Sequence, residues 1–465
     1  MYYKIKNNFA LRGWQKLPYA VCDMDKGSTM FINEAEFQAL SLCNGQVPFD
    51  AFYVLPEFKE IIKKAEERGF VEPISESSPL LPWQNYRLHD SRYMGTAHWS
   101  ITGRCNYKCR HCYMSAPDAK FGELSHARCL DIIDQLQSCG IRRVTVTGGE
   151  ALVRSDFWEL VDRMLAYGMH IDTVYSNGRL VNEKTLSAFE KRRIRPEFNL
   201  SFDGVGWHDW LRGIDGAEQE AIAAFKLCGE RGFPTGAEMC LHRRNKHTLR
   251  ETINLLASLG VAHIKTNPAS LSGEWIKNAG DDHLPQEELY DVYLDYIPYF
   301  FKDNMPMTVH LGGFFMGRKG SASYMLPFVK GNGAEAAGRR TVCDHARHHM
   351  YISAEGRVLP CMSLSGLEIQ NDFPLITETP LSECLTDSSY MRLIGTTVNS
   401  YIDENAECAS CEHKYYCCAG CRASALNTGS ELMGPDNASC LLFKGGYIPL
   451  IIKAASGGEC ANCSL

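Results

Sequence analysis

Long apolar runs are missing from this sequence, and "GYIPLII" near the C-terminus, one of the longest, is far too short to cross a bilayer. The first twenty residues contain no apolar segment of the kind that marks a secretory signal. Positive charge is not in excess, because 48 Lys and Arg stand against 55 Asp and Glu, which argues against a general nucleic-acid binder. We therefore expect a cytoplasmic protein with no membrane or nucleic-acid partner.

Low-complexity tracts are absent too, and no sequence repeat stands out. The 465 residues are 45% hydrophobic and 22% charged, which is typical of a globular chain with roughly two to four domains. We predict four regions. They are a small α/β module (1–90), an α/β barrel (91–270), a helical bridge (271–340) and a cysteine-rich domain (341–465).

The N-terminal module begins with two segments typical of a β-hairpin, 19–25 and 28–33. Two helices are predicted after it, over 34–45 and 56–70, each closed by a glycine. Residues 72–86 are rich in proline and serine and are interpreted as a linker.

The second region alternates short apolar strands with amphipathic helices. The predicted strands are 97–103, 142–149, 171–178, 197–204, 235–241 and 262–269, and the predicted helices are 124–140, 155–168, 182–192, 217–232 and 247–260. Such alternation implies parallel strands with right-handed crossovers. Six strands indicate a partial (β/α)6 barrel of the TIM type, with its chemistry at the carboxyl ends of the strands.

Cysteine is abundant, with 20 in the chain, and unevenly placed. None lies between Cys240 and Cys343, whereas eleven lie from Cys343 to Cys463. In a reducing compartment this density points to metal binding before disulfides. Seven others mostly lie in apolar patterns and are expected to be small buried hydrophobes: Cys22, Cys43, Cys129, Cys139, Cys228, Cys240 and Cys384.

Three cysteines gather in "CNYKCRHCY", directly after the first predicted barrel strand. Cys105, Cys109 and Cys112 could bind three irons of a [4Fe–4S] cluster and leave the fourth iron open. Zinc is the alternative, with His111 as the fourth ligand; a disulfide is the third.

This loop resembles the signature of the radical S-adenosylmethionine (SAM) superfamily, C-x3-C-x-Φ-C with Φ usually aromatic. His111 occupies Φ here, a mild departure because imidazole can still lie against adenine. The resemblance implies that the open iron binds SAM and that an electron from the cluster cleaves it to a 5'-deoxyadenosyl radical. It also implies cofactor contacts at the strand ends, from Gly148, Gly149, Glu150, Ser176, Asn177, Ser201, Asp203 and Arg212, and on the adenine side from His111, Leu241 and His242. Arg212 would pair with the methionine carboxylate, or else be a solvated surface arginine.

The C-terminal cysteines resemble the SPASM domain, which carries two auxiliary iron–sulfur clusters. By this resemblance one auxiliary cluster binds Cys408, Cys411, Cys417 and Cys440, and the other binds Cys343, Cys361 and Cys421, which makes three [4Fe–4S] clusters in all. Zinc knuckles are the alternative. Some relatives have an eighth cysteine shortly before the position of Cys343, and this chain has none there. The second set then leaves a vacant iron, unless Cys418, Cys460, Cys463 or a substrate thiolate fills it.

The N-terminal module is similar to the winged-helix-like RiPP recognition element, which binds the leader of a ribosomally synthesised, post-translationally modified peptide, often as an added strand. Together the resemblances imply a radical SAM peptide maturase of the sactipeptide type. It would act on a cysteine-rich precursor, form a thioether from cysteine to carbon, and receive electrons from flavodoxin or ferredoxin. The alternatives are carbon–carbon crosslinking, epimerisation with Cys240 as hydrogen donor, formylglycine-type maturation of a protein, and a small-molecule radical enzyme.

Overall fold

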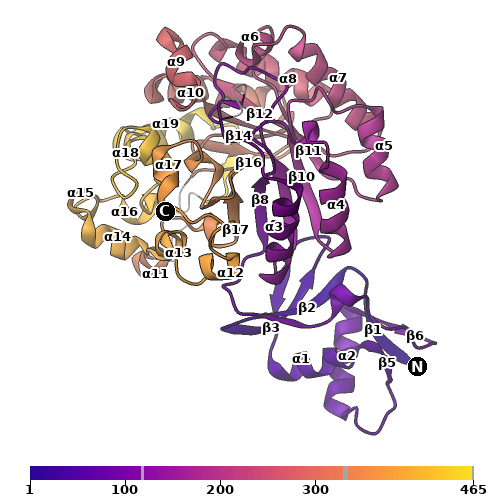
Figure 1. Ribbon diagram of the computed structural model, residues 1–465. Helices are drawn as coiled ribbons and strands as arrows, with labels where there is room; N and C mark the ends of the chain where they lie inside the picture. The colour runs from indigo at the N-terminus through magenta and orange to yellow at the C-terminus, as the bar shows by residue number, and fades with distance from the viewer. Residues whose placement is uncertain (117–119, 328–332, 463–465) are drawn as a thin grey trace.

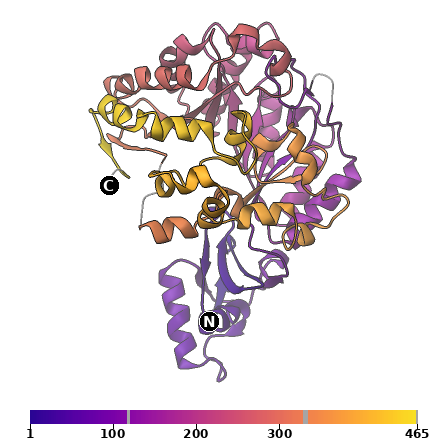
Figure 2. The ribbon, with the colours of Figure 1, turned by 90° about the vertical axis from the view of Figure 1, so that its left-hand side faces the viewer.

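The computed structural model describes residues 1–116, 120–327 and 333–462. It shows an N-terminal domain at one end of a strand–helix barrel and a C-terminal region of short helices along the barrel's side (Figure 1). A view from that side shows the C-terminal helices in front of the barrel strands (Figure 2).

The N-terminal domain contains two antiparallel-rich sheets and two helices. One sheet has the order β5-β1-β6 and the other β4-β3-β2-β7. The strands are β1 (Tyr2–Ile5), β2 (Phe9–Trp14), β3 (Leu17–Asp23), β4 (Thr29–Phe31), β5 (Asn44–Pro48), β6 (Val71–Ile74) and β7 (Arg87–His89), and the helices are α1 (Glu34–Ser41) and α2 (Pro56–Glu67). The predicted hairpin is present as β3 and β4. A capping box between Asn33 and Glu36 begins α1.

The predicted linker over 72–86 is wrong in its first residues. Residues 71–74 form β6, which pairs with β1 along its whole length. Pro73 is tolerated because β6 is an edge strand of its sheet. The stretch after β6 leads to β7, which pairs with β2 in the same domain before the chain enters the barrel at β8.

The barrel contains all six predicted strands, paired in parallel in chain order. They are β8 (Thr96–Ser100), β9 (Arg143–Thr147), β10 (His170–Ser176), β11 (Glu197–Ser201), β12 (Thr235–Leu241) and β13 (His263–Pro268). The helices of this region are α3 (His126–Ser138), α4 (Phe157–Ala166), α5 (Glu183–Lys191), α6 (His208–Arg212), α7 (Ala217–Glu230) and α8 (Leu249–Ser258). Only α6 was not predicted, because five residues carry no helical periodicity.

The helical bridge over 271–340 is wrong in part. Helices α9 (Trp275–Asn278), α10 (Gln286–Lys302) and α11 (Ala334–Arg339) are present, but so are strands β14 (Thr308–Leu311), β15 (Phe315–Gly317) and β16 (Ser323–Met325). β14 pairs in parallel with β13 and extends the barrel beyond six strands. Strands of three or four residues give too little alternation to be seen in the sequence.

The sheet also grows at its other edge. Two short strands of the C-terminal region, β17 (His349–Ile352) and β18 (Val358–Leu359), pair antiparallel, and β17 pairs in parallel with β8. The remaining elements are α12 (Leu381–Cys384), α13 (Ser389–Gly395), α14 (Val398–Glu404), α15 (Ala406–Ala409), α16 (Lys414–Cys417), α17 (Arg422–Asn427), α18 (Asn437–Lys444), α19 (Tyr447–Ala454) and β19 (Glu459–Cys460). Within the described ranges no helix is long and apolar enough to cross a membrane.

The sheet curves into a barrel wall with a polar inner face. Burial, and then the nearby charges of His349 and of Lys265 on β13, lower the pKa of His98 on β8, although four strands separate β8 from β13 in the sheet order. Side chains alternate between the two faces of a strand. Ala97 and Trp99 therefore pack into the helix-covered core, while His98 faces the inner side.

Candidate functional site

The cluster loop, Cys105–Cys112, lies at the carboxyl end of β8, as predicted. Its three thiols are partly buried. Burial raises the pKa of Cys105 to about 12 and that of Cys109 to about 11. These thiols therefore stay protonated until a cation replaces the protons.

The spacing of the sulfurs argues against zinc. Four sulfurs around one zinc ion at 2.3 Å lie about 3.8 Å apart. In the part of the chain that the structure describes, only His111, Asp203 and Cys240 bring three such ligand atoms within 4.8 Å of one another. Among the described residues no three cysteines meet this limit, which suits cysteines that each bind a different iron of one cluster.

Gly148 and Gly149 bring the end of β9 against the cluster loop. A Cβ atom on Gly148 would lie 2.7 Å from the Thr102 carbonyl oxygen, and one on Gly149 would lie 2.4 Å from that of Arg104. The amides of Gly149 and Glu150 donate hydrogen bonds of 2.9 Å to the same two carbonyl oxygens. Only glycine permits this approach.

Glu150 is buried and bonded inside the protein. Its carboxylate accepts hydrogen bonds from the Ser176 hydroxyl at 3.0 Å and the Asn177 amide at 2.8 Å. Burial nevertheless raises its pKa. Glu150 and Ser176 thus join the ends of β9 and β10, and their side chains are engaged with each other in this structure.

Asp203 and Arg212 form a buried ion pair, with 2.6 Å between Arg212 Nε and Asp203 Oδ2. The interpretation of Arg212 as a solvated surface arginine is therefore wrong. The other Asp203 oxygen accepts from the Cys240 amide at 2.9 Å. The ion pair holds the pKa of Asp203 far below its ordinary value, although burial alone acts in the opposite direction.

Two predictions at the end of β12 need correction. Leu241 is fully buried in the helix-covered core, so its side chain points away from the inner face. The neighbouring Cys240 takes the inner position instead and is only partly buried, unlike the six other cysteines predicted to be buried hydrophobes.

The His242 ring lies 5.0 Å from the Trp210 ring, centroid to centroid. Ser201 lies at the end of β11, in register with Glu238 of β12.

His111 lies beside Asp203, which follows β11, and Cys240 of β12. Burial lowers its pKa to about 3, so the ring is neutral, and Nδ1 has no hydrogen-bond partner among the described residues. An unpaired buried nitrogen at this position is available to a bound molecule.

The C-terminal cysteines form two groups. Cys408, Cys411, Cys417 and Cys440 line one cavity between α14 and α18. Burial, followed by the negative charge of Asp436 and the neighbouring thiols, raises the pKa of Cys417 to about 12.

The other group contains Cys343, Cys361 and Cys421. Burial, then repulsion from Cys361 and Cys421, raises the pKa of Cys343 to about 12. Cys418 is turned away and donates to the Tyr415 carbonyl oxygen at 3.3 Å. Cys460 is disulfide-bonded, and Cys463 lies outside the described residues.

Sequence reasoning missed Asp436, which ties the two groups together. Its carboxylate accepts from the Cys421 amide at 2.9 Å and from the hydroxyls of Ser424 and Ser439 at 2.7 and 2.6 Å. It is also the N-cap of α18. The "PDNASC" stretch before Cys440 is the signal that could have revealed it.

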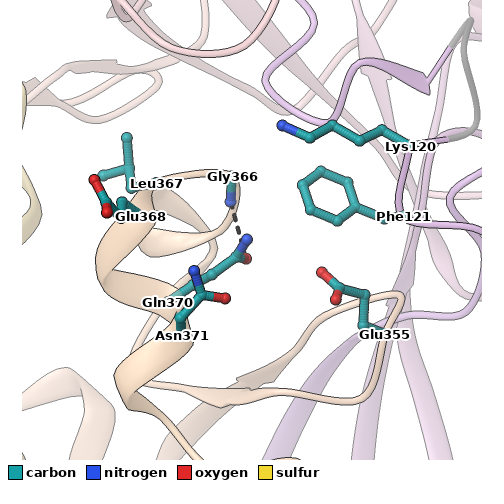
Figure 3. Close-up of a pocket in the computed structure, with 8 residues that line it drawn as sticks. All are labelled: Lys120, Phe121, Glu355, Gly366, Leu367, Glu368, Gln370 and Asn371. Atoms are coloured by element: carbon teal, nitrogen blue, oxygen red, sulfur yellow. Dashed lines mark hydrogen bonds between the residues drawn. The ribbon is translucent and has the colours of Figure 1, made fainter.

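A cavity of about 410 Å³ lies where the cluster loop's continuation meets the C-terminal region. Figure 3 shows Lys120 and Phe121 on one side, with Glu355 and the helix that carries Gln370 and Asn371 facing them. The charged and amide side chains that line this cavity make it polar, and it lies at the contact between the two regions.

Comparisons with known proteins agree with this geometry. Residues 99–256 match the radical SAM superfamily, and residues 343–412 match the SPASM iron–sulfur cluster-binding domain. The chain thus combines a radical SAM domain with a SPASM domain, in the fold of radical SAM enzymes.

Two relatives by sequence and one solved structure illustrate the similarity. The chain is 24% identical to pre-heme d1 synthase of Dinoroseobacter shibae over 74% of its length and 85% of that protein. It is 26% identical to the mycofactocin maturase MftC of Mycobacterium tuberculosis, over 73% and 81% of the two chains. The crystal structure of Streptococcus suis SuiB bound to the precursor peptide SuiA covers 94% of this chain and 99% of SuiB, with a TM-score of 0.64 and 16% identity.

Proposed function

We propose that this protein is a radical SAM peptide maturase that joins a cysteine sulfur of a ribosomal precursor peptide to a carbon atom. The observation that carries the thioether assignment is the three-thiol group of Cys343, Cys361 and Cys421. Cys418 is bonded elsewhere, and the segment before Cys343 has no cysteine. An auxiliary cluster held by three thiols leaves one iron for the substrate's thiolate.

The residues fit three [4Fe–4S] clusters and SAM. The cluster loop would hold the SAM-cleaving cluster, and the two C-terminal groups would hold the auxiliary clusters. When bound, these groups and SAM supply the adenosyl radical that removes a hydrogen atom from the substrate. The protein's part is to hold SAM through the backbone of Gly148 and Gly149 and the unpaired His111 ring. A flavodoxin or ferredoxin would supply the electrons.

A polar barrel interior supports a peptide as the substrate. TIM-type barrels are usually filled by branched aliphatic side chains, but here His98, Asn199 and Glu238 occupy inner positions. His98 Nε2 and Asn199 Oδ1 find no hydrogen-bond partner among the described residues. Lys265 is exposed on the same face. Peptide groups offer both donors and acceptors for such atoms along the whole length of the chain.

The N-terminal domain is proposed to bind the precursor's leader. It packs on the amino ends of the barrel strands, where the Arg142 guanidinium donates to the Ser28 carbonyl oxygen at 3.1 Å and the Trp14 indole to that of Cys139 at 3.4 Å. The cluster loop lies at the opposite ends of the strands. An extended peptide needs at least about six residues to pass a strand of this length. The modified residue should therefore follow the leader after a spacer of at least that length.

The test is the product mass. The reconstituted enzyme is incubated with SAM, reductant and the cysteine-containing peptide encoded beside its gene. Loss of two hydrogens per site, with thiols that vanish in step and are not restored by reductant, supports a thioether. The same mass loss with every thiol still alkylatable refutes it and indicates a carbon–carbon bond. Turnover of a tetrapyrrole with no change in the peptide would refute a peptide substrate.

Epimerisation is the second candidate, and Cys240 is the observation that favours it. Its thiol lies on the barrel's inner face, within 4.8 Å of ligand atoms of His111 and Asp203. A thiol there could return a hydrogen atom to a substrate radical. Deuterium uptake from heavy water with no other mass change would select this reaction over the thioether, and Cys240→Ala would abolish the uptake.

A further inference from the structure

Two buried side chains outside the cluster loop donate hydrogen bonds to its sulfur atoms. Arg212 Nη1 lies 3.8 Å from Cys109 Sγ, and Asn177 Nδ2 lies 3.9 Å from Cys105 Sγ. Both distances are within the range of N–H···S hydrogen bonds. Arg212 comes from α6 and Asn177 from the end of β10, so two separate elements approach two different cysteines.

Arg212 is fixed from both ends. Its Nε is held by Asp203 at 2.6 Å, and α6 itself is attached to the cluster loop. The Arg110 amide donates to the Leu211 carbonyl oxygen at 2.8 Å. Gly213, with φ +66°, closes α6 so tightly that a Cβ would lie 2.4 Å from the Lys108 carbonyl oxygen. The guanidinium therefore bridges a carboxylate and a cysteine sulfur.

Asn177 is fixed as firmly. Its backbone amide donates to Glu150 at 2.8 Å, and its Nδ2 also donates to Asn106 Oδ1 at 2.8 Å. Its own Oδ1 accepts from the Arg179 amide at 3.1 Å. These contacts direct the side-chain N–H groups toward the cluster loop.

We propose that Arg212 and Asn177 are positioning residues that make the SAM-cleaving cluster easier to reduce. Reduction adds one electron, taken from an external reductant, to a site already surrounded by three thiolates, and no bond of the protein changes. A positive charge and N–H dipoles aimed at the thiolate sulfurs stabilise the added negative charge. Burial strengthens this effect because little water screens it. Asp203 holds the guanidinium through Nε and leaves Nη1 for the Cys109 sulfur.

The inference rests on the proposed ligation of a cluster by Cys105, Cys109 and Cys112. The test is a redox titration of the reconstituted full-length enzyme, followed by the electron paramagnetic resonance signal that changes when SAM is added. Arg212→Gln should lower the reduced-to-oxidised ratio at a fixed potential about tenfold, which is 59 mV for one electron. Arg212→Lys keeps the positive charge but loses the planar guanidinium that can bond Asp203 and Cys109 at once. Its reduced-to-oxidised ratio should therefore lie between those of Arg212→Gln and the wild type. Asn177→Leu should lower the ratio by less than Arg212→Gln.

Arg244→Gln is the matched control. The Arg244 guanidinium lies 4.9 Å from the ring of Trp210, which belongs to α6, but it pairs with Asp282 at the surface. Loss of the Arg244 charge should therefore leave the reduced-to-oxidised ratio unchanged. An unchanged or raised ratio in Arg212→Gln at wild-type iron content overturns the proposal. If Arg212→Gln binds no iron, Arg212→Lys and Asn177→Leu decide, and wild-type ratios in both overturn it. A wild-type chain with no SAM-sensitive signal would instead refute the ligation itself.

Discussion

Replacing Gly149 by alanine tests whether the end of β9 supports the cluster loop. The new Cβ would lie 2.4 Å from the Arg104 carbonyl oxygen, 2.7 Å from its carbonyl carbon and 3.0 Å from Cys105 Cβ. Van der Waals contact needs about 3.5 Å, so either the loop or the strand end must move by about 1 Å. All three contacts lie on Arg104 or Cys105, which places the displacement at the first cysteine.

The cost of such overpacking is typically about 1–3 kcal/mol. The same displacement also strains the hydrogen bond from the Glu150 amide to the Arg104 carbonyl oxygen. We therefore expect Gly149→Ala to lower both the melting temperature and the iron bound by the cluster loop. Thermal unfolding by circular dichroism and iron analysis after anaerobic reconstitution measure the two effects.

Gly229→Ala provides the matched control. Gly229 lies near the end of α7, and the nearest atom to a new Cβ there is 3.9 Å away. Alanine is a better helix former than glycine by up to about 1 kcal/mol, so this variant should be as stable as the wild type or more so, with full iron. If Gly149→Ala also keeps wild-type iron and melting temperature, the supporting role of the glycine pair is refuted.

Three further predictions concern other parts of the chain. Cys421→Ala should lose about a third of the bound iron, whereas Cys418→Ala should keep all of it; equal iron in the two variants would contradict the grouping. Ser176→Ala removes a donor to the buried Glu150 carboxylate and should lower the free energy of unfolding by about 1–3 kcal/mol, measured by denaturant titration. Burial lowers the pKa of His98 to about 3, below an unfolded value of about 6.5. The folded state therefore binds fewer protons between these values, and stability falls as the pH drops below 6.5 and is unaffected by this group above it. His98→Phe should flatten that loss between pH 7.5 and 5.5, and an unchanged slope would contradict it.

The regular part of the fold could be predicted because each strand is followed by a helix with its own periodicity. The six barrel strands and the helices α3, α4, α5, α7 and α8 all carry that signal. Strands β14 and β17 could not be placed, since each is four residues long and reaches its parallel partner only after the chain has passed through other elements. β6 was missed because a proline in a short segment suggests a linker. Pro73 fits in this strand only because β6 lies at the edge of its sheet.

Within the candidate site, the sequence by itself determined the residue types and their order along the chain. The spacing of Cys105, Cys109 and Cys112, the glycine pair after β9 and the absence of a cysteine shortly before Cys343 are local facts that no folding is needed to establish. Only the tertiary structure decided which side chains meet. Arg212 and Asp203 are nine residues apart, yet their pairing and the approach of Arg212 to Cys109 depend on how α6 packs against the cluster loop. The alternation of β12 likewise turned Cys240 inward and Leu241 outward. Such contacts join residues distant in the chain, and they exist only once the barrel has closed around them.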